Sequence, residues 1–132
     1  MITRMHATVM FDREITDEHY ISPGGYAIKD KDGNELYFDF EYYEWDYNKG
    51  SKVIWISHKW LNLEEYPDAK DLEKYLNNLD CFTEFYIYTG EKNEDPEIKP
   101  VRILNIEFYD DEDRIYKLKS SNYKHALDWV TK

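Results

Sequence analysis

The sequence predicts a single α+β domain, residues 1–132, built mainly from an antiparallel sheet of six to seven strands with two helices packed on one face. Three observations predict this class. Several segments alternate apolar and polar residues, as half-buried strands do. Turn residues separate these segments at hairpin spacing. Two segments, 66–79 and 120–130, instead place apolar residues at helical spacing. The predicted order is one strand, three strands, a helix, three strands and a helix.

The first strand is predicted in residues 3–11, TRMHATVMF, because apolar side chains there alternate with polar ones. The apolar members are Met5, Ala7, Val9 and Phe11. Such a strand buries one face, and the sheet face that carries no helix would stay open to water or to a partner.

A hairpin is predicted within residues 25–46, with its turn at residues 32–34. A two-residue loop would place Asp30 opposite Glu35, two like charges. A three-residue loop pairs Lys31 with Glu35 instead and is therefore preferred. One side of the hairpin then faces the core through Tyr26, Ile28, Leu36, Phe38, Phe40 and Tyr42. The other side of its second strand carries Tyr37, Asp39, Glu41, Tyr43 and Trp45.

The middle of the chain is predicted as strand, helix and strand. Residues 52–61, KVIWISHKWL, are apolar on both faces, which suits a central strand. Residues 66–79 predict an amphipathic helix whose apolar stripe is Leu72, Tyr75, Leu76 and Leu79. Residues 81–90 return to a strand with Glu84, Tyr86 and Tyr88 on one of its faces.

A second hairpin is predicted in residues 101–121, with a three-residue tip at 111–113. This tip pairs residues that match in type: Asp110 with Arg114, Phe108 with Tyr116, Glu107 with Lys117 and Ile106 with Leu118. A last helix is predicted after Ser120 or Ser121, with Tyr123, Ala126, Leu127 and Val130 on its inner stripe. A duplicated unit of three strands and a helix is an alternative, although the two halves share no motif that can be aligned.

The net charge of −11 comes from two short segments. Residues 30–46 contribute −6 and residues 107–113 contribute −5, while acids and bases cancel in the rest of the chain. Direct binding to nucleic acid is disfavoured, because phosphate contacts need clustered Lys and Arg. A basic partner protein is favoured instead.

Catalytic and metal-binding motifs are weak. The segments DKDGN and YDDEDR hold oxygens that could gather a cation, but hairpin turns explain both. The four histidines are scattered, and Cys81 is the only cysteine, so no zinc motif exists. Asp39 and Glu41 would lie about 7 Å apart on one strand face, a separation seen between glycosidase carboxylates, yet spacing alone is weak evidence. We therefore expect no enzyme activity, no cofactor and no metal.

The sequence also predicts a cytoplasmic protein. It shows no apolar run that precedes a signal cleavage site and no stretch of 18 apolar residues. If the chain is encoded by a phage, its compartment would be the host cytoplasm.

The outward row of rings and carboxylates is the strongest functional hypothesis. Tyr and Trp contribute much of the energy of protein interfaces, and carboxylates attract and pair with Arg and Lys. The predicted partner-binding residues are Tyr37, Asp39, Glu41, Tyr43, Trp45, Asp111, Glu112 and Asp113. The partner would be a basic protein that binds or cuts nucleic acid. The row could instead be covered by another element of the chain or by a second copy in a homodimer.

In size, acidity and lack of catalytic motifs, the chain resembles small acidic inhibitors that phages encode against host defence, anti-CRISPR proteins among them, and also nuclease-specific immunity proteins. The resemblance is one of composition and covers no motif. It implies an inhibitor that occludes a basic, nucleic-acid-handling protein. Two other interpretations stay open: a domain whose aromatic platform binds a sugar or a nucleobase, and an enzyme of an unrecognised type.

Overall fold

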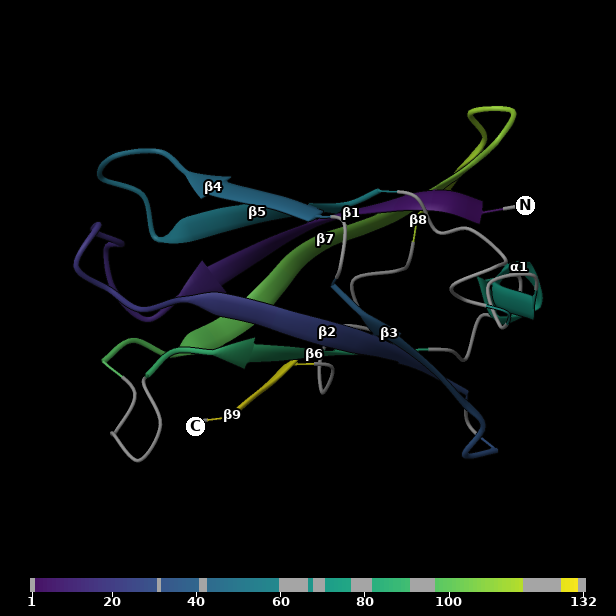
Figure 1. Cartoon of the computed structure of the whole chain (residues 1–132), viewed down its shortest axis with the longest axis horizontal. Helices are drawn as coiled ribbons and strands as arrows, with labels where there is room; N and C mark the ends of the chain where they lie inside the picture. Colours follow the sequence, from purple (N-terminus) through teal and green to yellow (C-terminus); the bar gives the residue numbers. More distant parts are fainter. Residues whose placement is uncertain are drawn as a thin grey trace.

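Two β-sheets packed face to face form the body of the molecule (Figure 1). The computed structural model describes residues 2–30, 32–40, 43–59, 67, 71–76, 82–90, 97–117 and 127–130. The elements are β1 (Ile2–Phe11), β2 (Ser22–Lys29), β3 (Glu35–Asp39), β4 (Tyr43–Tyr47), β5 (Val53–His58), α1 (Leu72–Leu76), β6 (Phe82–Tyr88), β7 (Pro100–Asp110), β8 (Ile115–Lys117) and β9 (Leu127–Val130). The predicted mainly antiparallel sheet is thus confirmed, but the predicted six to seven strands and two helices are not, because the described residues form nine strands in two sheets and one short helix.

The strands divide into a five-stranded sheet, sheet A, and a four-stranded sheet, sheet B. Sheet A has the order β4-β5-β1-β7-β8, and sheet B has the order β3-β2-β6-β9. Neighbouring strands are antiparallel except β6 and β9, which run parallel. The short helix α1 lies at one end of the two layers, near the N-terminus (Figure 1).

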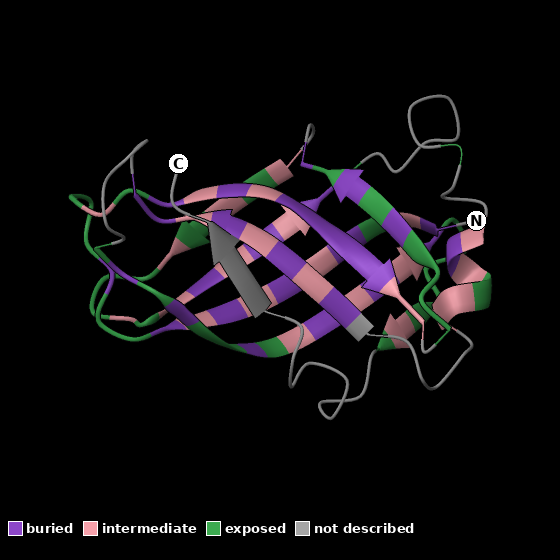
Figure 2. Cartoon of the chain, turned by 90° about the horizontal axis from the view of Figure 1, so that it is seen from below, coloured by how far each residue is buried: buried purple, intermediate pink, exposed green. Residues whose placement is uncertain are grey.

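Alternation of buried and more exposed residues is visible along the strands of both sheets (Figure 2). In β1 the predicted alternation is confirmed, because Met5, Ala7, Val9 and Phe11 are buried and the residues between them are only half-buried. Tyr26 on β2 is fully buried and lies between the layers, where its ring is 5.2 Å from Phe38, 5.8 Å from Phe85 and 6.4 Å from Phe108. Aromatic side chains from both sheets therefore form the centre of the core.

The register of the first hairpin differs from the prediction by two residues. Lys29, not Lys31, lies opposite Glu35, and the backbone N–H of Asp30 donates to the carbonyl oxygen of Asn34 at 3.0 Å where the turn begins and ends. The carboxylate of Asp30 accepts hydrogen bonds from the backbone N–H groups of Asp32 and Asn34, at 2.9 Å each. Gly33 adopts the left-handed conformation at φ 88°, which glycine tolerates better than the asparagine of the predicted register. A slide of two preserves the side of every residue, so the inward faces of β2 and β3 are as predicted.

The second hairpin has the predicted register. Glu107 lies opposite Lys117, and Phe108 lies opposite Tyr116. The predicted pair of Ile106 with Leu118 falls partly outside the described residues.

Three features of the predicted architecture are wrong. The strand predicted through residues 35–46 is two strands, since β3 belongs to sheet B and β4 to sheet A. The last helix is absent at Leu127–Val130, where the chain forms β9 beside β6. Leu127 and Val130 fit a helical stripe by spacing, but pairing with β6 decides the outcome. The other members of the predicted stripe, Tyr123 and Ala126, lie outside the described residues. The layer that covers each sheet is consequently the other sheet, not a pair of helices.

The first predicted helix is confirmed in its central part. Helix α1 buries Leu72 fully, and Tyr75 and Leu76 pack against the core. The fourth member of the predicted stripe, Leu79, lies outside the described residues. In the part of the chain that the structure describes, no helix has the length and apolar character needed to cross a bilayer.

Candidate binding surfaces

Tyrosines and carboxylates gather on the outer face of sheet B. On β3, Tyr37 and Asp39 point outward, and Tyr37 is 46% exposed. The pairing of β2 with β3 and β6 puts these residues beside the outward side chains of β6. We call the group formed by Tyr37, Asp39, Glu84, Tyr86 and Tyr88 the tyrosine–carboxylate face.

Two glycines of β2 allow these rings to lie close to the sheet. A Cβ atom on Gly25 would lie 2.7 Å from the Tyr37 hydroxyl oxygen, which is too close for any side chain. A Cβ atom on Gly24 would collide with the ring of Tyr88. The Tyr37 and Tyr86 rings contact each other at 5.7 Å between centroids. Because Gly24 and Gly25 have no side chains, the rings of Tyr88 and Tyr37 can pack directly against the backbone of β2.

Hydrogen bonds fix the orientation of the carboxylates on this face. The Tyr37 hydroxyl donates to Asp39, and burial together with this bond raises the pKa of Tyr37 to about 12. Glu84 accepts hydrogen bonds from Lys29 at 2.7 Å and from the Tyr86 hydroxyl at 3.3 Å. Burial and the negative charge of Glu84 raise the pKa of Tyr86. Both tyrosines therefore stay neutral donors at physiological pH.

The predicted row does not continue along the chain. Tyr43 and Trp45 lie on β4, where they are opposite His58 and Ile56 of β5. Facing residues on paired strands share a side, and His58 and Ile56 are buried. Tyr43 and Trp45 are accordingly half-buried against the core, and the expectation that they face outward with Tyr37 is wrong. Odd-numbered residues thus face outward on β3 and inward on β4, and Glu41, which lies between these strands in the sequence, is outside the described residues.

The acidic residues Asp111, Glu112 and Asp113 are exposed at the tip between β7 and β8. The tip projects past the sheets at the end where the N-terminus lies (Figure 1). Asp113 has φ 61°, and its exposed carboxylate pairs with Arg4 at 3.2 Å. The partner-binding role of these three residues stays a prediction.

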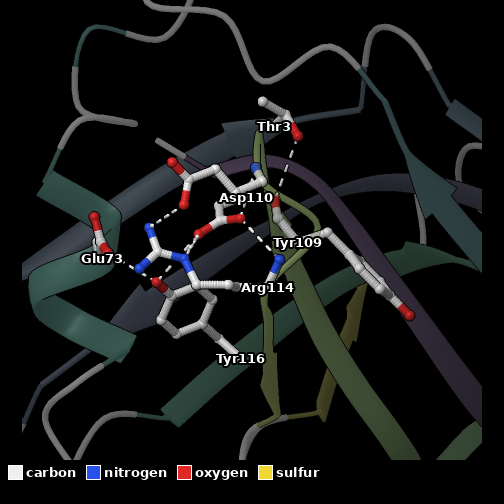
Figure 3. A network of polar contacts seen from close by, with 7 residues as sticks. Thr3, Glu73, Tyr109, Asp110, Arg114 and Tyr116 are labelled. Carbon is white, nitrogen blue, oxygen red and sulfur yellow. Dashed lines mark hydrogen bonds and ion pairs between the residues drawn. The ribbon is translucent and has the colours of Figure 1, made fainter.

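Asp110 organises this tip from beneath (Figure 3). Its buried carboxylate accepts hydrogen bonds from the backbone N–H groups of Glu112 and Arg114 at 2.9 Å and from Arg114 Nε at 2.7 Å. Burial favours a higher pKa, but these hydrogen bonds outweigh it and hold the pKa of Asp110 below its usual value. Tyr116 donates to Glu73 of α1 at 2.8 Å, which ties the hairpin to the helix.

A second surface lies on the outer face of sheet A, above β1 and β5. Two adjoining hollows, of about 240 and 540 Å³, share His6 and Ser57, which are hydrogen-bonded through Nδ1 and Oγ at 3.0 Å. Together they form one trough along the strands. Its lining is Arg4, Met5, His58, Lys59 and Tyr109 at one end, His6 and Ser57 in the middle, and Thr8, Asn48, Ser51, Val53 and Trp55 at the other end.

The sequence showed only part of these surfaces. The alternation of residues 81–90 placed Glu84 with Tyr86 and Tyr88, but it could not show that β6 lies beside β2. The trough went unnoticed because residues 53–57 resemble a strand with two buried faces, whereas Val53, Trp55 and Ser57 are only half-buried. Pairing between distant strands was the missing information in both cases.

Within the described ranges, no three His, Cys, Asp or Glu side chains are grouped so as to hold a metal ion. Comparison of the chain with protein-family models, with curated proteins and with solved structures finds no match.

Proposed function

We propose that this protein is a small acidic inhibitor that binds a basic, nucleic-acid-handling protein in the cytoplasm and occludes its nucleic-acid surface. The tyrosine–carboxylate face would be the docking surface. The observation that carries the proposal is the placement of three tyrosines and two carboxylates from β3 and β6 on one outer sheet face.

The chemistry of this face suits arginine and lysine. Tyrosine rings attract guanidinium groups through cation–π contacts, and carboxylates pair with them by charge-assisted hydrogen bonds. Asp39 is already oriented by Tyr37, and Glu84 by Tyr86 and Lys29. Groups held in place before association lose less conformational entropy when a partner docks.

The overall charge supports the same partner class. A net charge of −11 would speed encounter with a basic surface, and added salt would screen this attraction. A sheet holds its carboxylates at fixed spacing, so it can occupy the positions that phosphates take on the partner. The proposed mechanism is steric and electrostatic and requires no catalytic group.

The experiment captures partners from host lysate with the immobilised chain and tests whether capture blocks nucleic-acid binding. We expect the native chain to retain a basic protein at low salt. In a mobility-shift assay, the native chain should displace nucleic acid from that captured protein. Asp39→Lys should abolish both effects. Glu97→Lys, the same charge change at an exposed residue between β6 and β7, should preserve them.

Tyrosine variants separate ring contacts from charge. Tyr37 and Tyr20 are almost equally exposed, at 46% and 45%, but Tyr20 lies between β1 and β2. Tyr37→Ala should weaken capture, whereas Tyr20→Ala should not. Asp111→Lys reports whether the acidic tip takes part. The proposal would be contradicted if the captured protein still bound nucleic acid in the presence of the native chain. It would also be contradicted if the captured protein bound Asp39→Lys and the native chain with equal affinity.

A further inference from the structure

The trough on sheet A carries two aromatic rings toward one end. Trp55 lies opposite Thr8 of β1, and its indole ring stacks with His6 at 6.5 Å and an interplanar angle of 26°. Both side chains are half-buried, so each retains an accessible part. Indole and imidazole rings fixed on a sheet favour stacking with a flat heterocycle, because every such ring has a π-face.

The other end of the trough holds two basic side chains. Arg4 and Lys59 line the 240 Å³ hollow together with Met5, His6, Ser57, His58 and Tyr109. The adjoining hollow of about 330 Å³, which Arg4 and Lys59 also line, is acidic, because Asp110, Asp111 and Asp113 line it as well. The Arg4 guanidinium lies 4.6 Å from the centroid of the Tyr109 ring, which holds it over the sheet. Arg4 and Lys59 thus place two basic groups at one end of the trough. They suit a single anionic group such as a phosphate.

Carboxylates already pair with both cations. Arg4 contacts Asp113 and Lys59 contacts Glu44, at 3.2 Å in each case. All four side chains are at least 46% exposed, and exposed ion pairs are weak and easily exchanged. A phosphate group can therefore replace either carboxylate without leaving a buried charge unpaired.

Neutral hydrogen-bonding groups lie between the two ends. Ser57 lies opposite His6 between the two ends, and Thr8 lies opposite Trp55 at the aromatic end; both hydroxyls can donate or accept hydrogen bonds. Thr8 and Arg4 are four residues apart on β1, about 13 Å at the strand rise. A ligand that contacts both ends must therefore be elongated, with a polar hydroxylated middle.

We propose that the trough binds a nucleotide, with the base stacked on Trp55 and His6, the ribose along Ser57, and the phosphate at Arg4 and Lys59. This site is separate from the proposed partner surface, because the trough and the tyrosine–carboxylate face lie on the outer faces of different sheets. The acidity of the whole chain opposes contact with a long polyanion, but two cations at short range suffice for one phosphate group.

The test uses calorimetric titration of the full chain with the 5′-monophosphates of adenosine, guanosine, cytidine and uridine. At least one should bind, and the matching nucleoside and ribose 5-phosphate should each bind more weakly. Trp55→Ala should weaken binding of the nucleotide about fivefold or more, and Trp55→Phe, which keeps a ring, should restore most of it. Arg4→Ala should weaken binding of the nucleotide but leave the affinity for the nucleoside unchanged.

Tyr37→Ala is the matched control, since it removes an exposed ring from the opposite face. It should leave nucleotide affinity unchanged while it weakens partner capture, so the two proposals can fail independently. No binding of any of the four monophosphates would overturn the nucleotide proposal. Equal affinity of native chain and a folded Trp55→Ala variant, or equal affinity for nucleotide and nucleoside, would overturn it too.

Discussion

The hydroxyl oxygen of Tyr26 and Nδ1 of His58 are hydrogen-bonded at 2.9 Å where the two sheets meet. Both residues are fully buried, and the His58 ring packs edge-on against the rings of Tyr26 and Phe40. This contact joins β2 of sheet B to β5 of sheet A. It brings a titratable group into the core, and its consequences can be measured.

Stability should fall as the pH drops from 6.5 to 4. Burial lowers the pKa of His58 from 6.5 to about 4, so in this window the unfolded chain binds a proton that the folded chain excludes. This difference in proton binding lowers the free energy of unfolding by about 3 kcal/mol between pH 6.5 and pH 4. Measured by urea unfolding across these pH values, the free energy of unfolding should depend less steeply on pH in His58→Gln than in the native chain. His19→Gln, a change in the loop before β2, serves as control, and parallel curves for all three proteins would refute this assignment.

Removing the hydroxyl of Tyr26 should destabilise the fold with little change in packing. Tyr26→Phe keeps the ring but deprives His58 of this hydrogen bond, at a cost of about 1–2 kcal/mol. Chemical denaturation measures the change in the free energy of unfolding. Tyr20→Phe, at an exposed position, should change it by less than about 0.5 kcal/mol. An equal effect of both substitutions would show that the hydroxyl of Tyr26 has no structural role.

Replacing Gly25 with alanine should destabilise the fold and displace Tyr37. The new Cβ atom would lie 2.7 Å from both the Phe38 carbonyl oxygen and the Tyr37 hydroxyl oxygen. Relief requires a shift of β3, at about 1–3 kcal/mol. Gly33→Ala is the comparison, because it meets no atom within 4 Å and introduces only backbone strain at φ 88°. Gly25→Ala should weaken partner capture and Gly33→Ala should not; a fully stable Gly25→Ala with native capture would contradict the packing described for this face.

Thr83 offers a site where a polar atom can be removed without loss. Its hydroxyl oxygen is buried on the core face of β6 and has no hydrogen-bond partner among the described residues. Thr83→Val keeps the shape and removes the cost of burying that oxygen, so stability should rise by up to about 1 kcal/mol. A thermal unfolding scan that shows a clearly lower melting temperature would reveal a partner for this hydroxyl.

The sequence predicted individual strands better than their assembly. Alternation located β1, both hairpins and the inward sides of Tyr26 and Phe38, because side-chain parity is a local property of an extended chain. It could not show that the chain turns from sheet B to sheet A between β3 and β4. It also gave a helix where β9 pairs with β6, because that pairing joins residues about forty positions apart.

The candidate site follows the same pattern. Tyr37 and Asp39 were placed on an outer face correctly, because both lie within one short strand. Tyr43 and Trp45 were not, since their side depends on the corner that begins β4 and on pairing with β5. Tyr86 and Tyr88 join the face only through the β2–β6 pairing, which no local pattern encodes.

The most direct test of the proposed docking surface is the rate at which the captured basic protein associates with the native chain and with Asp39→Lys, measured at two salt concentrations that differ about tenfold. If the tyrosine–carboxylate face docks the partner, the native rate should fall steeply at the higher salt, and the variant should associate slowly at both. Identical association rates and salt dependences for the native chain and Asp39→Lys would contradict it.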